Sequence, residues 1–332
     1  MTFTPHQIEC CTRSFYNCGK LTGDLFAENS GMVKLEYLAF GKTGLTEITI
    51  PETMLYLCGG VFTECPKLKT LNWKSELFFA PQEKKPEYSL YNGNYSTGQL
   101  FAILDNSTDA AFGKKGHYES QYSSYDYRSM GNFAEALEYA SNMDSYEDKT
   151  TLETLNIYVS DDAFVRYNST FWEMQPLLET VNIHAVWKTV PNCAFQACAS
   201  LKNFNMDYPE QLKNVYENAF AICGFEELVL PGNVSYDKGA FCFNRNLKKV
   251  VIEEGVTELP FLAFERCEKL TQVSIPESLV AFGVASLKGA GDHLTIYVPT
   301  KVEVIEDDAF TYGNSSAERI ALILMDDPII ET

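Results

Sequence analysis

The sequence predicts an α/β-type repeat solenoid, in which each short unit adds one strand to a parallel β-sheet and returns through turns or a short helix. Two observations support this fold class: a recurring Ala-Phe dipeptide and an alternating apolar pattern before it. The dipeptide occurs nine times, and from Phe195 onward the pattern steps by 21 to 25 residues. This period is too short for a propeller blade of about 40 residues and fits short strand-containing repeats. The Phe positions are Phe40, Phe112, Phe164, Phe195, Phe220, Phe241, Phe264, Phe282 and Phe310.

The strand of each unit is a short I-x-I segment. In residues 270–276, LTQVSIP, apolar and polar residues alternate, so one face of the strand is expected to be buried and the other solvated. Strands one repeat apart must run parallel, which requires a crossover connection. We therefore expect a right-handed stack with a parallel β-sheet on its concave face and mixed turns and short helices on its convex side.

The return path of each unit carries the Ala-Phe dipeptide and a small residue three positions after the Phe. We expect the Ala to allow close approach of the layers and the Phe to fill the core between them. Phe282 is out of register with this column, and Ala285-Ser286 fits the spacing better. The small residues are expected to point inward and bond the turn backbone. They are Cys18, Cys65, Cys198, Cys223, Asn244 and Cys267.

The 332 residues are predicted to form a single elongated domain, 1–332, of about 10–12 units of roughly 23 residues. Residues 74–150 break the regular step and hold nine of the 19 Tyr. Because their Leu and Ala-Phe spacing matches that of a later unit, we interpret them as degenerate, insertion-bearing repeats with a short helix over 130–140. A second helix is expected after Ser160 or Asp161, either of which could cap it.

These units resemble the BspA-like, Treponema-type leucine-rich-repeat family, which occurs in surface proteins of gut and oral bacteria and of some parasitic protists. The resemblance rests on the template L-x-x-I-x-I-P followed by A-F-x-x-C-x-x-L, and it covers residues 10–73 and 152–325. It implies a leucine-rich-repeat fold. It names no ligand, because members of the family share the scaffold and differ in what they bind.

Composition and motifs argue against several classes of function. With 26 Lys and Arg against 45 Asp and Glu, the net charge is −19, which disfavours nucleic acid and anionic membranes as partners. No apolar run approaches the about 18 residues of a membrane-spanning helix, and the first residues do not read as a secretion signal. Metal-ligand spacing and Gly-rich phosphate loops are missing, and Cys198 with His184 is the nearest Cys–His pair in sequence. We expect neither enzymatic activity nor a cofactor or metal.

The ten cysteines are expected to be mostly free and buried. Those of the small-residue column read as core thiols. A disulfide remains open among the cysteines outside that column, which are Cys10, Cys11, Cys58, Cys193 and Cys242.

The strand residues that point away from the core form the candidate site. They are mostly Thr and Asn and give a polar ribbon along the concave face, the surface that solenoids use for binding. The alternative is a solvated sheet in which Thr and Asn satisfy one another across strands. The strip Asn156, Asn182 and Asn205 is the first choice for a contact surface, and the Tyr-rich insertion is the second. The candidate contacts are Thr49, Asn72, Thr154, Asn156, Thr180, Asn182, Asn203 and Asn205.

The sequence therefore predicts a non-enzymatic binding or adhesion module, at the cell surface or secreted, that recognises a host protein or a glycan through the concave face or the inserted loops. The alternative is an intracellular, cytoplasmic scaffold for protein–protein interaction, which the free thiols and the missing leader favour. Direct membrane insertion is not expected, and the oligomeric state is left open.

Overall fold

The computed structural model divides the chain into two compact units. Unit 1 comprises Met1–Trp187 and Asn203–Pro209, and unit 2 comprises Lys188–Lys202 and Glu210–Thr332. The single domain expected over 1–332 stays a prediction. The residues that the structure describes are 8–24, 31–36, 38–54, 56–57, 61–75, 151–161, 175, 177–291, 294–311 and 321–324.

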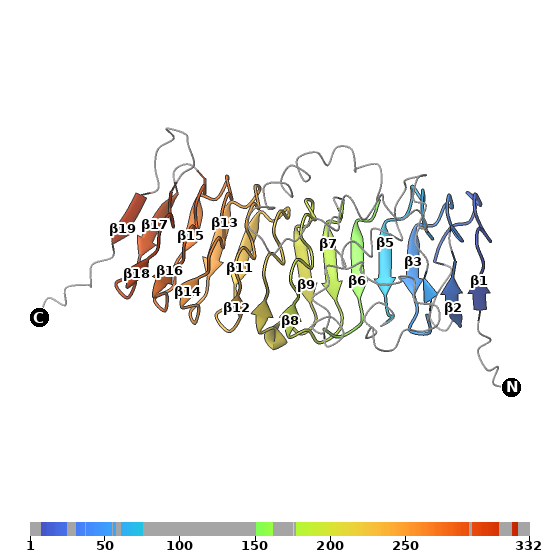
Figure 1. Ribbon diagram of the computed structural model, residues 1–332, viewed down its shortest axis with the longest axis horizontal. Helices are drawn as coiled ribbons and strands as arrows, with labels where there is room; N and C mark the ends of the chain where they lie inside the picture. Colours follow the sequence, from blue (N-terminus) through green and yellow to red (C-terminus); the bar gives the residue numbers. More distant parts are fainter. Residues whose placement is uncertain are drawn as a thin grey trace, which may run out of the picture. The chain divides into compact units, whose positions relative to one another are not determined.

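Unit 1 contains two parallel sheets, whose strands stack side by side (Figure 1). A three-stranded sheet has the order β1-β2-β4, and a five-stranded sheet has the order β3-β5-β6-β7-β9. The buried and half-buried residues alternate along β5, β6 and β7, as the period of two predicts. The strands are β1 (Ile8–Cys10), β2 (Met32–Leu35), β3 (Glu47–Ile50), β4 (Tyr56–Leu57), β5 (Thr70–Trp73), β6 (Thr154–Ile157), β7 (Thr180–Ile183) and β9 (Asn203–Met206).

Unit 2 contains three parallel sheets. The strand orders are β12-β10-β8, β14-β16-β18 and, for the five-stranded sheet, β11-β13-β15-β17-β19. The strands are β8 (Thr189–Val190), β10 (Asn214–Val215), β11 (Glu227–Leu230), β12 (Ser235–Tyr236), β13 (Lys249–Ile252), β14 (Glu258–Leu259), β15 (Gln272–Ser274), β16 (Ala281–Phe282), β17 (Thr295–Val298), β18 (Val304–Ile305) and β19 (Ala321–Leu324).

The predicted fold class is confirmed: successive units pair their strands in parallel, and almost no helix is present among the described residues. The one helical element there is the 3₁₀ turn η5 (Pro209–Gln211). None of the described helical residues forms a segment long and apolar enough to cross a membrane. The helices expected over 130–140 and after Asp161 lie outside the described residues.

Strands β5 and β6 pair directly, although residues 74–150 lie between them in the sequence. Asn72 and Asn156 are direct partners in this pairing, although 84 positions separate them. The sequence predicted degenerate, insertion-bearing repeats in this interval, and that interpretation stays a prediction. The Tyr-rich segment itself lies outside the described residues.

The Phe column packs as predicted. In unit 2 the rings of Phe195, Phe220, Phe241 and Phe264 stack at centroid distances of 5.7, 5.8 and 5.7 Å. Phe264 is fully buried, and its neighbours in the stack are nearly so. Such stacked pairs add to the stability that comes from burying the rings.

Two residues of each return path adopt the left-handed backbone conformation, two positions before and two positions after the Phe column. This regularity shifts the predicted register by one residue. Ala285 has the left-handed backbone that precedes the dipeptide, so Ser286-Leu287, and not Ala285-Ser286, occupies the position of Ala-Phe in this unit. Phe264 N donates to Ser286 O, as the register requires. Phe282 is out of the column, as predicted, and lies in β16. The first set is Arg13, Leu38, Cys193, Asn218, Gly239, Leu262, Ala285 and Asp308, and the second is Asn17, Lys42, Glu64, Ala197, Ile222, Phe243, Arg266 and Gly289.

The small-residue column bonds each turn to the preceding one. The side chains of four members donate to the carbonyl of the Phe one turn earlier: Cys65 to Phe40 at 3.2 Å, Cys223 to Phe195 at 3.2 Å, Asn244 to Phe220 at 3.0 Å and Cys267 to Phe241 at 3.4 Å. Asn244 also accepts from Cys223 N at 2.9 Å. The prediction is wrong for Cys18, which is exposed because no described turn covers it.

Candidate functional site

The outward column of the five-stranded sheet in unit 1 is a ladder of four asparagines. Asn72, Asn156, Asn182 and Asn205 are partners in the registers of β5, β6, β7 and β9. From Asn156 onward, each Nδ2 donates to the Oδ1 of the preceding Asn, at 2.7 Å, 2.8 Å and 2.8 Å. We call these four residues the amide ladder. The sequence placed them in one column, and the structure joins them into one hydrogen-bonded chain.

The direction of the amide ladder follows from its first partner. Asn72 Nδ2 lies 2.7 Å from Glu47 Oε1 and 3.2 Å from Thr49 Oγ1. A carboxylate can only accept, so Asn72 turns its Nδ2 toward Glu47 and its Oδ1 toward Asn156. Every later asparagine has the same orientation, with Nδ2 toward the preceding residue, so the Oδ1 of Asn205 is the last acceptor of the ladder. Because hydrogen bonds in a chain polarise one another, this terminal oxygen is a strengthened acceptor.

The amide ladder keeps hydrogen-bonding capacity for a ligand. Each asparagine inside it uses one of two N–H donors and one of two acceptor positions of Oδ1. Asn72, Asn156 and Asn182 are half-buried, and Asn205 is exposed. Strands lie about 4.8 Å apart, so the ladder offers a free donor and a free acceptor at that interval.

The neighbouring Thr column is less uniform. Thr154 and Thr180 are half-buried, and Asn203 is exposed and donates to Thr180 Oγ1 at 3.3 Å. Thr49 differs from the other candidates, since it is only 4% exposed and donates to Asp24 Oδ2 at 2.6 Å. It therefore anchors the start of the ladder and presents little surface to a ligand.

A third outward column, which the sequence analysis missed, follows the ends of the same strands. Lys74 Nζ lies 5.0 Å from the centre of the Tyr158 ring, the Tyr158 and His184 rings stack at 4.7 Å, and His184 Nδ1 lies 3.1 Å from Asp207 Oδ2. Each of these four residues lies two positions after an asparagine of the amide ladder. Because every second residue of a strand faces the same side, the sequence alone could have placed them on the outward face. The column adds a cation, two aromatic rings and a carboxylate beside the neutral amides.

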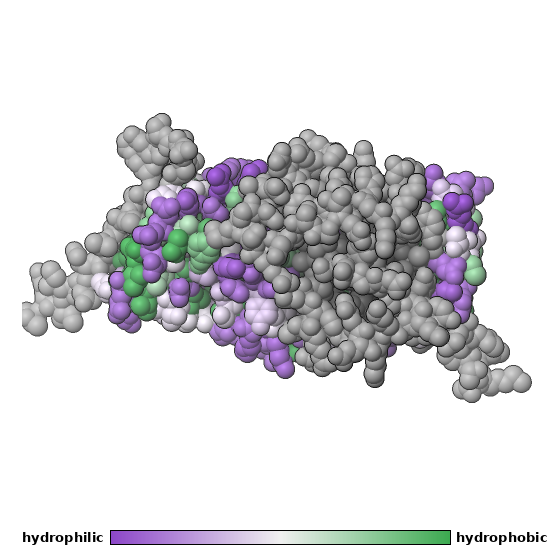
Figure 2. Space-filling view, in the orientation of Figure 1, coloured by the Kyte–Doolittle hydropathy of each residue, from purple (hydrophilic) through white to green (hydrophobic). Residues whose placement is uncertain are grey.

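The corresponding column of unit 2 has a different chemistry. Val229, Val251 and Ser274 are partners in the registers of β11, β13 and β15. The register Gln272–Thr295 continues this line to Tyr297 on β17. Val229 is 57% exposed and Tyr297 is 55% exposed. We call these four residues the apolar column. Figure 2 shows hydrophobic residues gathered among hydrophilic ones over the C-terminal strands of this unit.

The described residues offer little for chemistry. No group of three or more His, Cys, Asp or Glu within them could hold a metal ion. Burial raises the pKa of the Cys223 thiol well above its ordinary value, and the nearby Cys198 raises it further. Burial likewise raises the pKa of Cys242, which disfavours the reactive thiolate form. All cysteines in this part of the chain are free thiols, including four of the five for which a disulfide was left open; Cys58 lies outside it.

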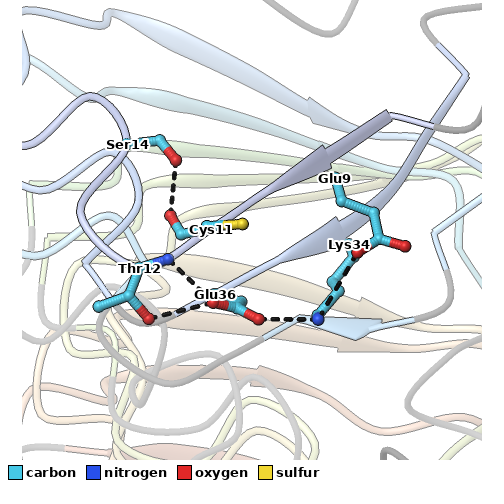
Figure 3. Close-up of polar contacts among 6 residues, drawn as sticks. All are labelled: Glu9, Cys11, Thr12, Ser14, Lys34 and Glu36. Atoms are coloured by element: carbon cyan, nitrogen blue, oxygen red, sulfur yellow. Dashed lines mark hydrogen bonds and ion pairs between the residues drawn. The ribbon is translucent and has the colours of Figure 1, made fainter.

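A further polar cluster holds the first turns of unit 1 together (Figure 3). The Glu36 carboxylate accepts from Thr12 N at 2.9 Å and Thr12 Oγ1 at 3.1 Å, and it pairs with Lys34 at 2.7 Å. Lys34 also lies 3.6 Å from Glu9. The hydrogen bond from Lys34, with those from Thr12, lowers the pKa of Glu36. These bonds join consecutive turns, so the cluster has a structural role.

The repeat pattern and the parallel sheets point to one family. Residues 1–83, 165–290 and 235–317 match the family described as the BspA type leucine rich repeat region, with six copies. The chain belongs to this family. Leucine-rich repeat proteins are generally protein-interaction modules, and members of this family are typically binding scaffolds, often associated with the bacterial surface. No curated protein matches the chain.

Several solved structures are similar to this family member. A leucine-rich repeat protein of Bacteroides ovatus is 14% identical, with 92% of this chain and 71% of that chain covered and a TM-score of 0.36. The leucine-rich repeat protein TpLRR of T. pallidum is 21% identical over 41% of this chain and 75% of that chain, with a TM-score of 0.32. A leucine-rich cell surface protein of Faecalibacterium prausnitzii is 16% identical over 84% and 74%, with a TM-score of 0.28. Likenesses this distant say nothing about what this chain binds.

Proposed function

We propose that the chain is a non-enzymatic binding module, displayed at a cell surface or secreted, that holds a host glycan or protein on the amide ladder of unit 1. The observation that carries the proposal is the ladder itself, a row of uncharged amides in which Asn156, Asn182 and Asn205 each keep one donor and one acceptor position for a ligand. Such a row is sequence-encoded at four separate strands and is not needed to close the core.

The chemistry of the ladder favours a glycan over a protein surface. A sugar hydroxyl both donates and accepts, which matches the free N–H and the free oxygen position of each asparagine. The outward residues of β5, β6 and β7 are Thr and Asn, so the ladder offers hydrogen-bonding groups to a ligand and little apolar surface of its own. The exposed Asn205 Oδ1 provides an end at which a hydroxyl can donate.

An array experiment tests this proposal. The fluorescently labelled protein is applied to a glycan array and to an array of host-matrix proteins, as wild type and as Asn182→Ala. We expect a glycan signal for the wild type and an about tenfold weaker one for Asn182→Ala, which loses one contact and interrupts the ladder. Ser274→Ala, an outward substitution in unit 2, is the matched control and is expected to bind as the wild type does.

Two results would contradict the proposal. The first is the absence of a ligand on either array together with a turnover activity of the purified protein. The second is equal glycan binding by the wild type and Asn182→Ala, with both variants folded by circular dichroism. Signal confined to the protein array would replace the glycan by a protein as the ligand.

A cytoplasmic interaction scaffold is the second candidate, and the thiols favour it. Every cysteine that the structure describes is free, which suits a reducing compartment. Fractionation of the native host separates the two candidates. Protein found only in the cytosol would remove the surface-displayed or secreted module, and protein in the envelope or medium would remove the scaffold.

A further inference from the structure

The apolar column of unit 2 is a second surface that the amide ladder does not explain. Its members Val229 and Tyr297 have the two largest exposed fractions of any large hydrophobic side chain among the described residues. Val251 between them is half-buried, and Ser274 is exposed. Exposed apolar side chains aligned on one face are typical of a docking surface, whereas scattered ones need no explanation.

We propose that the apolar column binds a short amphipathic helix of a partner protein, with an apolar stripe and with Lys or Arg beside it. The spacing of the column carries the choice of a helix. Rungs lie about 4.8 Å apart, and the same side of a helix returns every turn, after about 5.4 Å. In an extended peptide, side chains of one face recur only after about 6.7 Å. The side chains on one face of a helix therefore match the spacing of the four rungs closely, whereas those on one face of an extended peptide do not.

The shape of the column favours the same occupant. Ser274 is exposed and carries a smaller side chain than Val251 and Tyr297 on either side of it in the column. A Leu or Met of the helix can pack over Ser274 and against the Tyr297 ring. Buried aromatic anchors of this kind commonly dominate the affinity of an interface.

Charge selects a basic partner. The chain carries a net charge of −19. Glu253 is exposed directly after β13, and Glu227 is exposed two positions before Val229. Lys249 faces Glu227 in the register of β11 and β13 and offsets part of its charge. The uncompensated negative side is therefore that of Glu253, and we expect the basic residues of the helix to lie there.

A model peptide tests the proposal directly. The probe is a fluorescent helix of about 14 Leu and Lys residues, long enough to cover the four rungs, with Leu at i, i+3, i+4 and i+7. Its anisotropy is measured against the full chain. We expect Tyr297→Ala and Val229→Glu each to weaken binding about tenfold, and Glu253→Lys to weaken it about threefold. Asn182→Ala, in unit 1, is the control and is expected to leave the affinity unchanged.

Two peptide controls and one folding control keep the result interpretable. A peptide of the same composition without the apolar stripe, and one with a central Pro that prevents the helix, are both expected to bind about tenfold more weakly. Equal binding of either peptide would overturn the helix, and undiminished binding by Tyr297→Ala and Val229→Glu would overturn the site. Both side chains are more than half exposed, so the variants should keep the circular dichroism spectrum of the wild type.

Discussion

The two units use the same interior and different exteriors. Unit 1 and unit 2 each contain a five-stranded parallel sheet and a stacked Phe column. On the outward side, unit 1 carries the amide ladder, whose members bond to one another. Unit 2 carries the apolar column, whose members are exposed or half-buried and whose side chains form no such chain of hydrogen bonds among the described residues. The repeat therefore fixes the core, and the residue between two apolar strand positions is free to differ between the units.

The largest effect is expected where the two units are alike. Phe40→Ala in unit 1 and Phe220→Ala in unit 2 each remove a buried ring that stacks on both sides, and each should lower the free energy of unfolding by about 3–5 kcal/mol. Urea denaturation followed by circular dichroism measures the loss. Phe15→Ala, at a ring that is 39% exposed, is the control and should cost about 1 kcal/mol. A loss below that of the control in one unit would show that the two cores are not equivalent.

The sequence predicted this shared interior well, for a physical reason. A buried Phe and an alternating strand must recur in every unit, so their period is visible without a structure. The column of Asn72, Asn156, Asn182 and Asn205 could be predicted for the same reason. The continuous hydrogen-bonded chain within it could not, because it depends on the orientation that Glu47 imposes at one end.

The features that the sequence did not predict depend on how strands pair in the fold, which local residue spacing does not determine. The direct pairing of β5 with β6 could not be read from the Leu and Ala-Phe spacing of residues 74–150, because the pairing joins strands on either side of that interval. The predicted ribbon of outward residues runs through β9 and β11, but the structure assigns these strands to separate sheets. Lys74, Tyr158, His184 and Asp207 were missed because the template ended at the second apolar residue of each strand.

A smaller effect separates the two exteriors. In a double-mutant cycle, Asn156→Ala and Asn182→Ala should show a coupling energy of about 1 kcal/mol, because the two amides share a hydrogen bond. The matched cycle of Val229→Ala and Val251→Ala in unit 2 should couple by less than about 0.5 kcal/mol. Urea unfolding of the four variants in each cycle provides the numbers. Equal coupling in both cycles would mean that the ladder bonds add nothing to ordinary neighbour contacts.

The smallest effect concerns two glutamates with opposite pKa shifts. Hydrogen bonds from Lys34 and Thr12 lower the pKa of Glu36 in unit 1, whereas burial raises the pKa of Glu265 in unit 2; both start from 4.5. The contribution of Glu36 is therefore present above pH 4.5 and lost as the pH falls through its folded pKa. Protonated Glu265 is favoured in the fold, so its contribution is present below pH 4.5 and lost as the pH rises through its folded pKa.

Substitution by Gln tests these signs. At pH 7, Glu36→Gln should lower the free energy of unfolding by about 0.5 kcal/mol and Glu265→Gln should raise it by a similar amount. Thermal unfolding at pH 7 and at pH 3 measures both, and both differences should shrink at the lower pH. A change of the same sign for the two variants at pH 7 would contradict the assignment.

We propose that the two exteriors bind different ligands, and a crossed binding measurement tests both surfaces at once. Asn182→Ala and Tyr297→Ala are each titrated with the array-selected glycan and with the Leu–Lys helix. We expect Asn182→Ala to lose about tenfold in glycan affinity alone, and Tyr297→Ala to lose about tenfold in helix affinity alone. Two folded variants that each weaken both ligands, or neither, would contradict it.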